Sequence, residues 1–302
     1  MSKTHRIKVY DGPKSYGGKF LTDGMTDFAP GKYEILVIDF SDCRFLEPIQ
    51  LVGLASLIEL YAQSGVLIRF EGVRHLEVAE YLENIRFFDY WQADFNREAY
   101  TKTQIGTNLG LWKISQPMID AYTTSAQRFY QENYFETFDL SPLAIALMEL
   151  FNNIFDHSES PVTGYTMSQY YPHKHKLKVA VCDLGVGICN KVNTFKAAQS
   201  KPALPDHQAL ELAFQKSFST KSTLRNRGFG LDTIRSICSA SDGRIFVASN
   251  AGVLKYQGNQ LQSYSVNNSF PGTHFEFVLD TRKFDEAEED SNSDIISLDE
   301  LF

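Results

Sequence analysis

The feature that most constrains the fold of this chain is a nearly continuous apolar run, YEILVIDFSD, at residues 33–42. An unbroken run rich in β-branched residues is typical of a strand buried on both faces, in a sheet that helices cover. The following segment, PIQLVGLASLIELYAQSG at 48–65, has proline in a first helical turn, apolar residues at helical spacing and a closing glycine. We therefore predict a buried strand followed directly by a helix.

A second strand and a second helix complete a first domain. The sequence VLIRFEG at 66–72 predicts the strand, and EVAEYLENIRFF at 77–88 predicts a helix with one apolar face. Residues 1–100 are therefore expected to form a small α/β domain. Weak periodicity, with several polar and glycine residues, then predicts a linker at 101–117.

The remaining chain predicts a second α/β domain at residues 118–283. The expected elements, in order, are helices at 118–133 and 141–158, a hairpin at 164–183 with its turn at 172–175, a long polar and basic loop that is partly helical, a helix at 227–240 and four strand-like segments, GRIFVASN, GVLKYQ, LQSYSV and GTHFEFVLD. Glycine-containing turns separate these last strands.

Acidic residues gather at the C-terminal end, where residues 284–302 hold eight acids and no lysine or arginine. Of the 37 acids, the other 29 balance 29 lysines and arginines, so the rest of the chain is formally neutral. A neutral body argues against non-specific nucleic-acid binding, which needs a basic surface. We expect the acidic segment to be a disordered tail.

Composition also indicates a compartment. No stretch reaches the roughly 18 apolar residues of a membrane span, and MSKTHRIKVYDG has no apolar core of a secretory signal. The four cysteines are scattered without the CxxC spacing of a zinc ribbon or a disulfide framework. We therefore expect a cytoplasmic protein without a membrane segment.

The expected helix at 141–158 carries many polar groups for a segment that is otherwise apolar. Glu149, Asn153, Asp156 and His157 have the spacings i, i+4, i+7 and i+8, so they share the face opposite the apolar stripe. An amphipathic helix normally has a solvated polar side, so these residues alone do not define a site. His157 could support Glu149 or the geometry of a metal site, or it could simply hydrogen-bond to backbone groups at the helix end.

Two glycine-containing segments follow this helix. VCDLGVGI ends a strand at Asp183, whose carboxylate could accept from an exocyclic amine, while Gly185 and Gly187 let backbone approach a ring or a phosphate. RGFGLDTI puts Gly228 and Gly230 at a helix start, where free N–H groups and the helix dipole favour anions. Taken singly, the first pattern is typical of a tight turn and the second of an ordinary helix start.

Taken in order, the ExxxN helix, the DxGxG strand end and the GxG helix start resemble the GHKL ATPase superfamily, which includes gyrase, heat-shock chaperone, histidine kinase and mismatch-repair ATPase domains. The matching pieces are the N box at 149–153, the G1 box at 183–188 and the G2 box at 228–231. GTHFEFVL resembles the family's last strand, in which a threonine after glycine supports the adenine-binding aspartate. The resemblance spans about residues 120–280 and implies a two-layer α/β sandwich.

The resemblance implies a role for each matching residue. Glu149 would act as general base and Asn153 would bind Mg²⁺. Asp183 would hold adenine, with support from Thr273. The other residues expected around ATP are Gly185, Gly187, Ile188, Gly228, Gly230, Leu231 and Lys221. Lys221 lies on a basic loop that would close over the γ-phosphate, so ATP and Mg²⁺ are the implied cofactors.

Within the superfamily, the nearest resemblance is to the anti-sigma-factor serine kinases. Their E-x-x-x-N-x-x-x-H-G helix matches Glu149, Asn153 and His157, but Ser158 stands where glycine would be. Their lid also resembles FSTKSTLRNRGFGLDTI. No helical dimerisation segment with a phosphoacceptor histidine is evident, which disfavours a histidine kinase.

The first domain resembles STAS domains, the fold of the antagonist proteins that such kinases phosphorylate. The similar segment runs from residue 35 to residue 72. At the helix start, where an antagonist presents a phosphoacceptor Ser or Thr, this chain has LEPIQ, from Leu46 to Gln50, and no hydroxyl. Phosphorylation at that place by the chain's own second domain is therefore not implied.

These patterns leave three functions open: a serine/threonine protein kinase, an ATPase that hydrolyses ATP as a conformational switch, and a non-enzymatic nucleotide-binding scaffold. The STAS-like module and the acidic tail indicate a protein partner, and because the related kinases and clamps pair, a homodimer is one possibility. His173 and His175 could bind a metal but lack a third ligand nearby. Cys182 and Cys189 are most simply interpreted as core residues.

Overall fold

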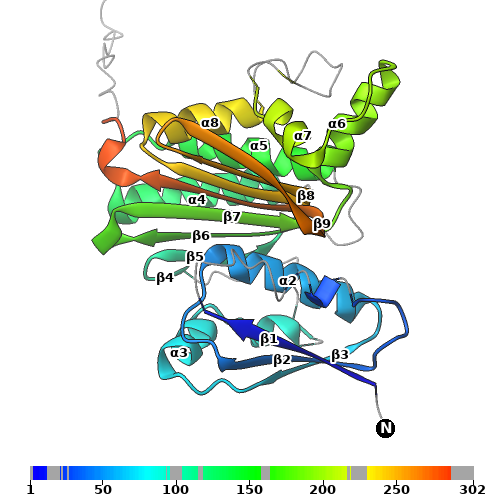
Figure 1. The fold of residues 1–302 in the computed structure, drawn as a ribbon. Helices are drawn as coiled ribbons and strands as arrows, with labels where there is room; N and C mark the ends of the chain where they lie inside the picture. Colours follow the sequence, from blue (N-terminus) through cyan, green and yellow to red (C-terminus); the bar gives the residue numbers. More distant parts are fainter. Residues whose placement is uncertain are drawn as a thin grey trace, which may run out of the picture.

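The computed structural model describes residues 3–11, 21, 23–25, 27–92, 94–95, 104–114, 118–157, 164–215, 218 and 230–286, with 104–105 and 153–157 described by backbone alone. The chain is a mixed α/β protein with two sheets, as Figure 1 shows. Within these ranges no helix has the length and the apolar character needed to cross a bilayer. The part of the expected acidic tail at 287–302 lies outside them.

The first sheet has three parallel strands in the order β1 (Thr4–Tyr10), β2 (Ile35–Asp42) and β3 (Leu67–Glu71). β2 is the predicted apolar strand, and it takes the central position, with half of its side chains buried. α2 (Pro48–Gln63) and α3 (Leu76–Asn84) agree with the two predicted helices. β1 was not predicted, although its alternating polar and apolar residues are the pattern of an edge strand with one exposed face.

The second sheet has six antiparallel strands in the order β4-β5-β6-β7-β9-β8. Its strands are β4 (Gln104–Ile105), β5 (Asn108–Lys113), β6 (Tyr165–Tyr171), β7 (Lys176–Asp183), β8 (Arg244–Gln257) and β9 (Gln260–Asp280). β6 and β7 form the predicted hairpin, with a short 3-10 turn between them. The four strand-like segments expected after it join in pairs, as the long strands β8 and β9.

The segment expected to be a linker contributes strands to the second sheet. We predicted a linker at 101–117, and its described residues include β4 and β5, which form one edge of the six-stranded sheet. All residues of β5 from Asn108 to Trp112 are buried. The weak periodicity of this segment reflects a strand covered on both faces, which shows no alternation.

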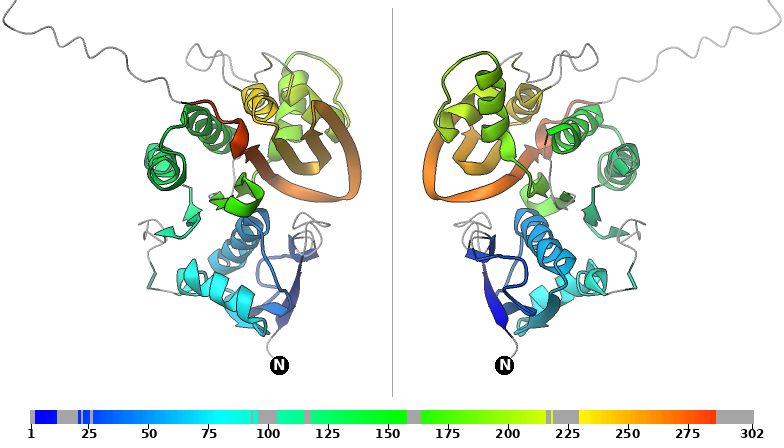
Figure 2. Two further views of the ribbon diagram at one scale, coloured as in Figure 1. Left: turned by 90° about the vertical axis from the view of Figure 1, so that its left-hand side faces the viewer. Right: turned by 90° about the vertical axis from the view of Figure 1, so that its right-hand side faces the viewer.

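Helices cover the six-stranded sheet on one face. These are α4 (Met118–Tyr134), α5 (Ser141–His157) and α8 (Leu231–Ala240), and Figure 2 shows them end-on beside the sheet. The polar loop expected to be partly helical contains two short helices, α6 (Gly187–Ala198) and α7 (Asp206–Ala213). The long β8–β9 hairpin packs against α7.

The start of the expected tail is packed against the second domain. The ring of Phe284 lies 5.3 Å from that of Phe135, measured between centroids. The backbone N–H of Asp139 donates to the carbonyl of Asp285 over 2.9 Å. The chain therefore remains packed against the segment that joins α4 to α5 as far as Glu286, where an isolated bridge to Phe138 forms.

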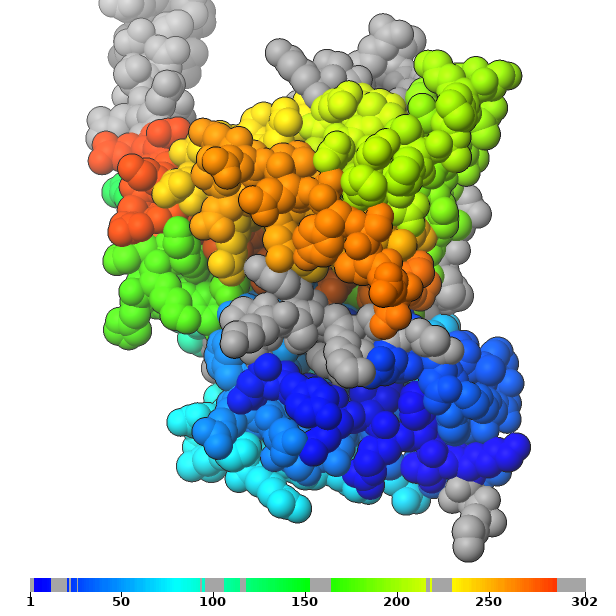
Figure 3. Space-filling model, in the orientation of Figure 1, coloured from blue at the N-terminus to red at the C-terminus, as the bar shows by residue number. Residues whose placement is uncertain are grey.

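Strand alternation gives the six-stranded sheet two separate apolar faces. In β7 and β9, Val181 and Phe275 point toward α5 and α8 and belong to one core, while Ala180 and Cys182 belong to a second core that includes α2. Figure 3 shows the three-stranded part of the chain (blue to cyan) directly below the six-stranded part.

α2 lies between the two sheets and contacts both (Figures 1 and 2). Its residues are buried almost without interruption from Pro48 to Tyr61. Near its C-terminal end, the buried Glu59 carboxylate accepts from Lys113 Nζ at 3.0 Å and from Tyr165 OH at 2.8 Å. A helix that is apolar on every side needs partners on every side, and here the two sheets supply them.

Candidate functional site

Asp183 and Thr273 lie opposite each other at one end of the six-stranded sheet. Asp183 is the last residue of β7 and pairs in register with Thr273 of β9. Only 2% of Asp183 is exposed. Its Oδ1 accepts from the backbone N–H of Gly185 at 2.8 Å, and Thr273 also hydrogen-bonds to its carboxylate. The carboxylate is therefore held in one orientation at the C-terminal end of β7.

The environment of Asp183 sets its protonation. Burial raises the pKa of its carboxyl group from 3.8 to about 7, although hydrogen bonds from Gly185 and Thr273 act in the opposite direction. A buried carboxylate gains from any further N–H donor. Asp183 is thus suited to accept a hydrogen bond from a neutral ligand that carries an amino group.

Glycines allow the chain to turn tightly after Asp183. Gly187 has φ +78°, and a Cβ built there would lie 2.6 Å from Ser249 Oγ and 2.8 Å from the Gly272 carbonyl oxygen. Gly272 has φ +94° and would similarly collide with Gly185 N at 2.7 Å. No larger residue fits at either position without displacing backbone. Gly187 therefore has a packing role within the protein, whatever ligand the turn approaches.

Hydrogen bonds tie this turn to the β8–β9 side of the sheet. The backbone N–H of Ile188, which is half-buried, donates to Ser249 Oγ at 2.8 Å. Ser249 Oγ in turn donates to the carbonyl of Gly272 at 2.8 Å, and Asn250 Nδ2 donates to the carbonyl of Val186 at 3.1 Å. Sequence reasoning missed Ser249 and Asn250, and the polar pair that ends the GRIFVASN segment was the only signal for them.

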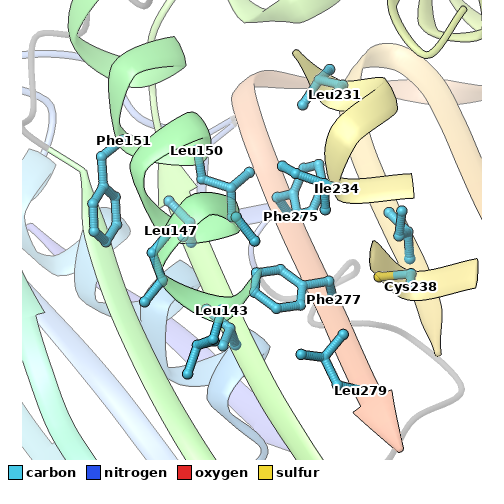
Figure 4. Packing of buried hydrophobic residues seen from close by; sticks show 14 of the residues in the cluster. Leu143, Leu147, Leu150, Phe151, Leu231, Ile234, Cys238, Phe275, Phe277 and Leu279 are labelled. Atoms are coloured by element: carbon cyan, nitrogen blue, oxygen red, sulfur yellow. The ribbon is translucent and has the colours of Figure 1, made fainter. Parts of the chain in front are cut away.

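The C-terminal half of α5 and the N-terminal end of α8 lie toward the same end of the sheet. Figure 4 shows Leu150 of α5 and Leu231 of α8 toward the Phe275 end of β9, whereas Leu143 lies toward the Leu279 end. Phe275 is two residues from Thr273, and both side chains project from the same face of β9. Asp183 shares that face because it pairs with Thr273. Three segments far apart in sequence therefore converge there.

Two predicted site residues lie on α5. Glu149 is half-buried, and Asn153 follows it by one helical turn. The side chains of Asn153 and His157 are outside the described residues, so the Mg²⁺ ligand stays a prediction. Leu147, Leu150 and Phe151 form the expected apolar stripe and are buried.

The glycine-rich start of α8 is described from Gly230 onward. The Gly230 carbonyl accepts from the Thr233 N–H at 2.9 Å, so helical bonding begins there. Leu231 is buried and belongs to the core beside Ile234, so its side chain packs inside the protein. Lys221 and Gly228 lie outside the described residues.

The other sequence candidates are two histidines at the hairpin turn and two cysteines near Asp183 in the sequence. His173 and His175 are exposed at the hairpin turn, and the described part of the chain holds no group of three His, Cys, Asp or Glu suited to a metal ion. Cys182 and Cys189 are fully buried, as expected of core residues. Burial raises the pKa of both thiols, that of Cys189 to about 12, so neither is a thiolate at neutral pH.

No protein-family model matches this chain, and no curated protein matches it at a significant level. The functional interpretation therefore depends on the motifs in the sequence and on the geometry around Asp183.

Proposed function

We propose that this chain is an Mg²⁺-ATP-binding regulatory protein of the GHKL type, with a STAS-like first domain, and that it transfers the γ-phosphate of ATP to a protein or to water. The observation that carries the proposal is the convergence at one end of the six-stranded sheet. There Asp183 and Thr273, the C-terminal half of α5 and the start of α8 approach one another. These are the segments whose motifs resemble the three boxes of the superfamily.

The adenine end of the site is supported by the chemistry of Asp183. Its buried carboxylate is already oriented by Gly185 N–H and Thr273, and it retains acceptor capacity because a carboxylate has about four lone-pair directions. The exocyclic amine of adenine would donate to it. Guanine has a carbonyl oxygen at the ring position where adenine carries this amine, and an oxygen cannot donate to the carboxylate, so the site would favour adenine over guanine.

The phosphate end would lie toward α5 and α8. Glu149 is one helical turn before Asn153 on α5, which suits a general base beside a metal ligand. Glu149 would draw a proton from the attacking hydroxyl or water, and the amide oxygen of Asn153 would hold Mg²⁺. When bound, Mg²⁺ supplies charge neutralisation at the phosphates, and this is much of what phosphoryl transfer requires. Free N–H groups at the start of α8 would face the anion.

The contacts of α2 bear on which phosphoryl acceptor is involved. Glu47, at the α2 start, pairs with Lys178 Nζ at 2.5 Å, and its side chain is 14% exposed. The position at which STAS-like antagonists present a hydroxyl is therefore occupied by an acid that faces the six-stranded sheet. This favours a separate protein as acceptor, or hydrolysis as a switch, over phosphorylation of α2.

Binding is tested by titrating the full chain with ATP, with and without Mg²⁺, in a calorimeter. Asp183→Asn should weaken ATP binding at least tenfold, because an amide presents one acceptor oxygen and adds a donor. Glu276→Gln is the matched control: Glu276 is also a buried carboxyl group whose pKa burial raises to about 7, but it lies on the α2 face of the sheet. Equal affinity in wild type and Asp183→Asn would refute the adenine contact.

The reaction is tested with γ-phosphate-labelled ATP, Mg²⁺ and either wild type or Glu149→Gln. Label that moves to protein in a lysate identifies a kinase, whereas label released as phosphate identifies an ATPase. Either result should be lost in Glu149→Gln while ATP binding remains. Binding without any movement of label would overturn the enzymatic proposal and leave the nucleotide-binding scaffold.

A further inference from the structure

The side of α2 that faces the six-stranded sheet lies directly behind the proposed adenine site. Ile49, Gly53 and Ser56 follow one another at spacings of four and three residues, so they share one helix face. Gly53 allows a close approach, since a Cβ built there would lie 3.2 Å from His274 Nε2. All of these residues are buried, so this face of α2 packs directly against β7 and β9.

Strand alternation connects this contact to Asp183 and Thr273. His274 follows Thr273 on β9, and Cys182 precedes Asp183 on β7, and these two are paired in register. Successive residues of a strand point to opposite faces, so His274 and Cys182 face α2 while Asp183 and Thr273 face α5. The same two backbone segments thus hold the carboxylate on one side and α2 on the other.

Hydrogen bonds join α2 to these backbone segments. His274 Nε2 lies 2.6 Å from the carbonyl oxygen of Ile49. A carbonyl oxygen only accepts, so the imidazole is the tautomer with its proton on Nε2. The Ser56 hydroxyl lies 3.3 Å from the carbonyl oxygen of Cys182 and 3.0 Å from that of Val52, so it is shared between the strand and its own helix.

The burial of His274 favours a hydrogen bond to Ile49 that persists at physiological pH. It is 2% exposed, and its ring stacks on that of Phe270 with 5.5 Å between centroids. Burial lowers the pKa of its imidazole to about 4, so the ring is neutral at physiological pH and the bond to Ile49 persists.

We infer that His274 is a positioning residue for the Asp183–Thr273 pair, and that α2 of the three-stranded unit acts through it as the support of the nucleotide site. Loss of the bond to Ile49 would let β9 shift at Thr273, whose hydrogen bonds help to keep Asp183 ionised. The role of His274 in orienting Asp183 stands on geometry alone. Its effect on ATP binding rests on the proposed function.

The test measures Asp183 directly, by NMR titration of the full chain with ¹³C-labelled aspartate carboxyl groups, assigned with Asp183→Asn. In His274→Leu the pKa of Asp183 should rise by about one unit, because the Thr273 hydrogen bonds to the carboxylate weaken. At pH 7 this would reduce its ionised fraction from about one half to about one tenth, and the Kd for Mg²⁺-ATP should rise about fivefold. His274→Gln, whose Nε2 can still donate to Ile49, should restore both values.

Controls keep the outcomes distinct. Glu276→Gln changes another buried, α2-facing residue of β9 and should leave the pKa of Asp183 where it is. Should His274→Leu not fold, His274→Asn replaces it, because its shorter amide cannot reach Ile49. A folded variant of either kind with the wild-type pKa at Asp183 overturns the inference. A shifted pKa in a protein that binds no ATP upholds His274 as a positioning residue and refutes the proposed function.

Discussion

Replacing Asp183 with asparagine should change how the stability of this protein depends on pH. Burial raises the pKa of Asp183 to about 7 in the folded chain, against 3.8 for an ordinary aspartate. Below pH 3.8 the group is protonated in both the folded and the unfolded state, so it adds no pH dependence. Between the two pKa values only the folded state keeps the proton, and the free energy of unfolding falls as the pH rises.

The size of this effect follows from the width of that window. A pKa difference of roughly three units, at about 1.4 kcal/mol per unit, corresponds to about 4 kcal/mol lost between pH 4 and pH 7. Asparagine does not titrate, so Asp183→Asn loses none of it. The free energy of unfolding of the variant, minus that of wild type, should therefore rise by about 4 kcal/mol across the window and become constant above it.

Urea unfolding at a series of pH values measures this difference, followed by circular dichroism and tryptophan fluorescence where the two transitions coincide. Other titrating groups are common to both proteins and cancel in the subtraction. Glu276→Gln provides a second case, with an expected rise of about 3 kcal/mol, because burial raises the pKa of Glu276 from 4.5 to about 7. A difference for Asp183→Asn that changes by less than about 1 kcal/mol between pH 4 and pH 8 would refute the reasoning.

Three further predictions concern the turn, the α2 contact and the ligand. Gly187→Ala should lower the free energy of unfolding by about 2 to 5 kcal/mol, measured by urea unfolding. Gly65 has the same φ of +78° but open space around it, so Gly65→Ala should lower it by only about 1 to 2 kcal/mol. Equal losses in the two variants would contradict the packing argument. Lys113→Ala should cost about 3 to 5 kcal/mol because it leaves the Glu59 carboxylate buried without its cation, and Glu59→Gln in the same chain should recover part of that loss. The affinity for ATP should fall by up to about tenfold per pH unit below pH 7, as Asp183 becomes protonated, and calorimetry should show no such trend in Asp183→Asn.

Much of the fold could be predicted from the sequence because single elements can be recognised from their local pattern of apolar and polar residues. The apolar run of β2, the helical stripe of α5 and the turn of the β6–β7 hairpin are all recognised from side chains within one element. The position of Asp183 at a strand end was predicted in the same way. Such patterns report which face of an element is apolar, and they need no knowledge of what covers it.

Other features were decided by tertiary structure, because they depend on which elements meet. Nothing in the segment 101–117 indicates that it would pair with β6, since a short strand buried on both faces carries no periodicity. The bond from His274 to Ile49 joins residues separated by 225 positions, and no local rule connects them. The helical spacing of apolar residues in α2 predicted the helix, but not that two sheets would bury it on nearly every side.

For the candidate site too, some features were predictable from the sequence and others depended on the tertiary structure. The sequence by itself determined the chemical groups: a carboxylate at a strand end, glycines in the turn after it, an acid on the polar face of α5 and glycines before α8. The tertiary structure alone decided that the described segments converge at one end of the six-stranded sheet, and that Asp183 is buried there beside Thr273. The reason is physical: residue type sets what a group can bond to, whereas its burial and its pKa depend on neighbours that only the folded chain brings together.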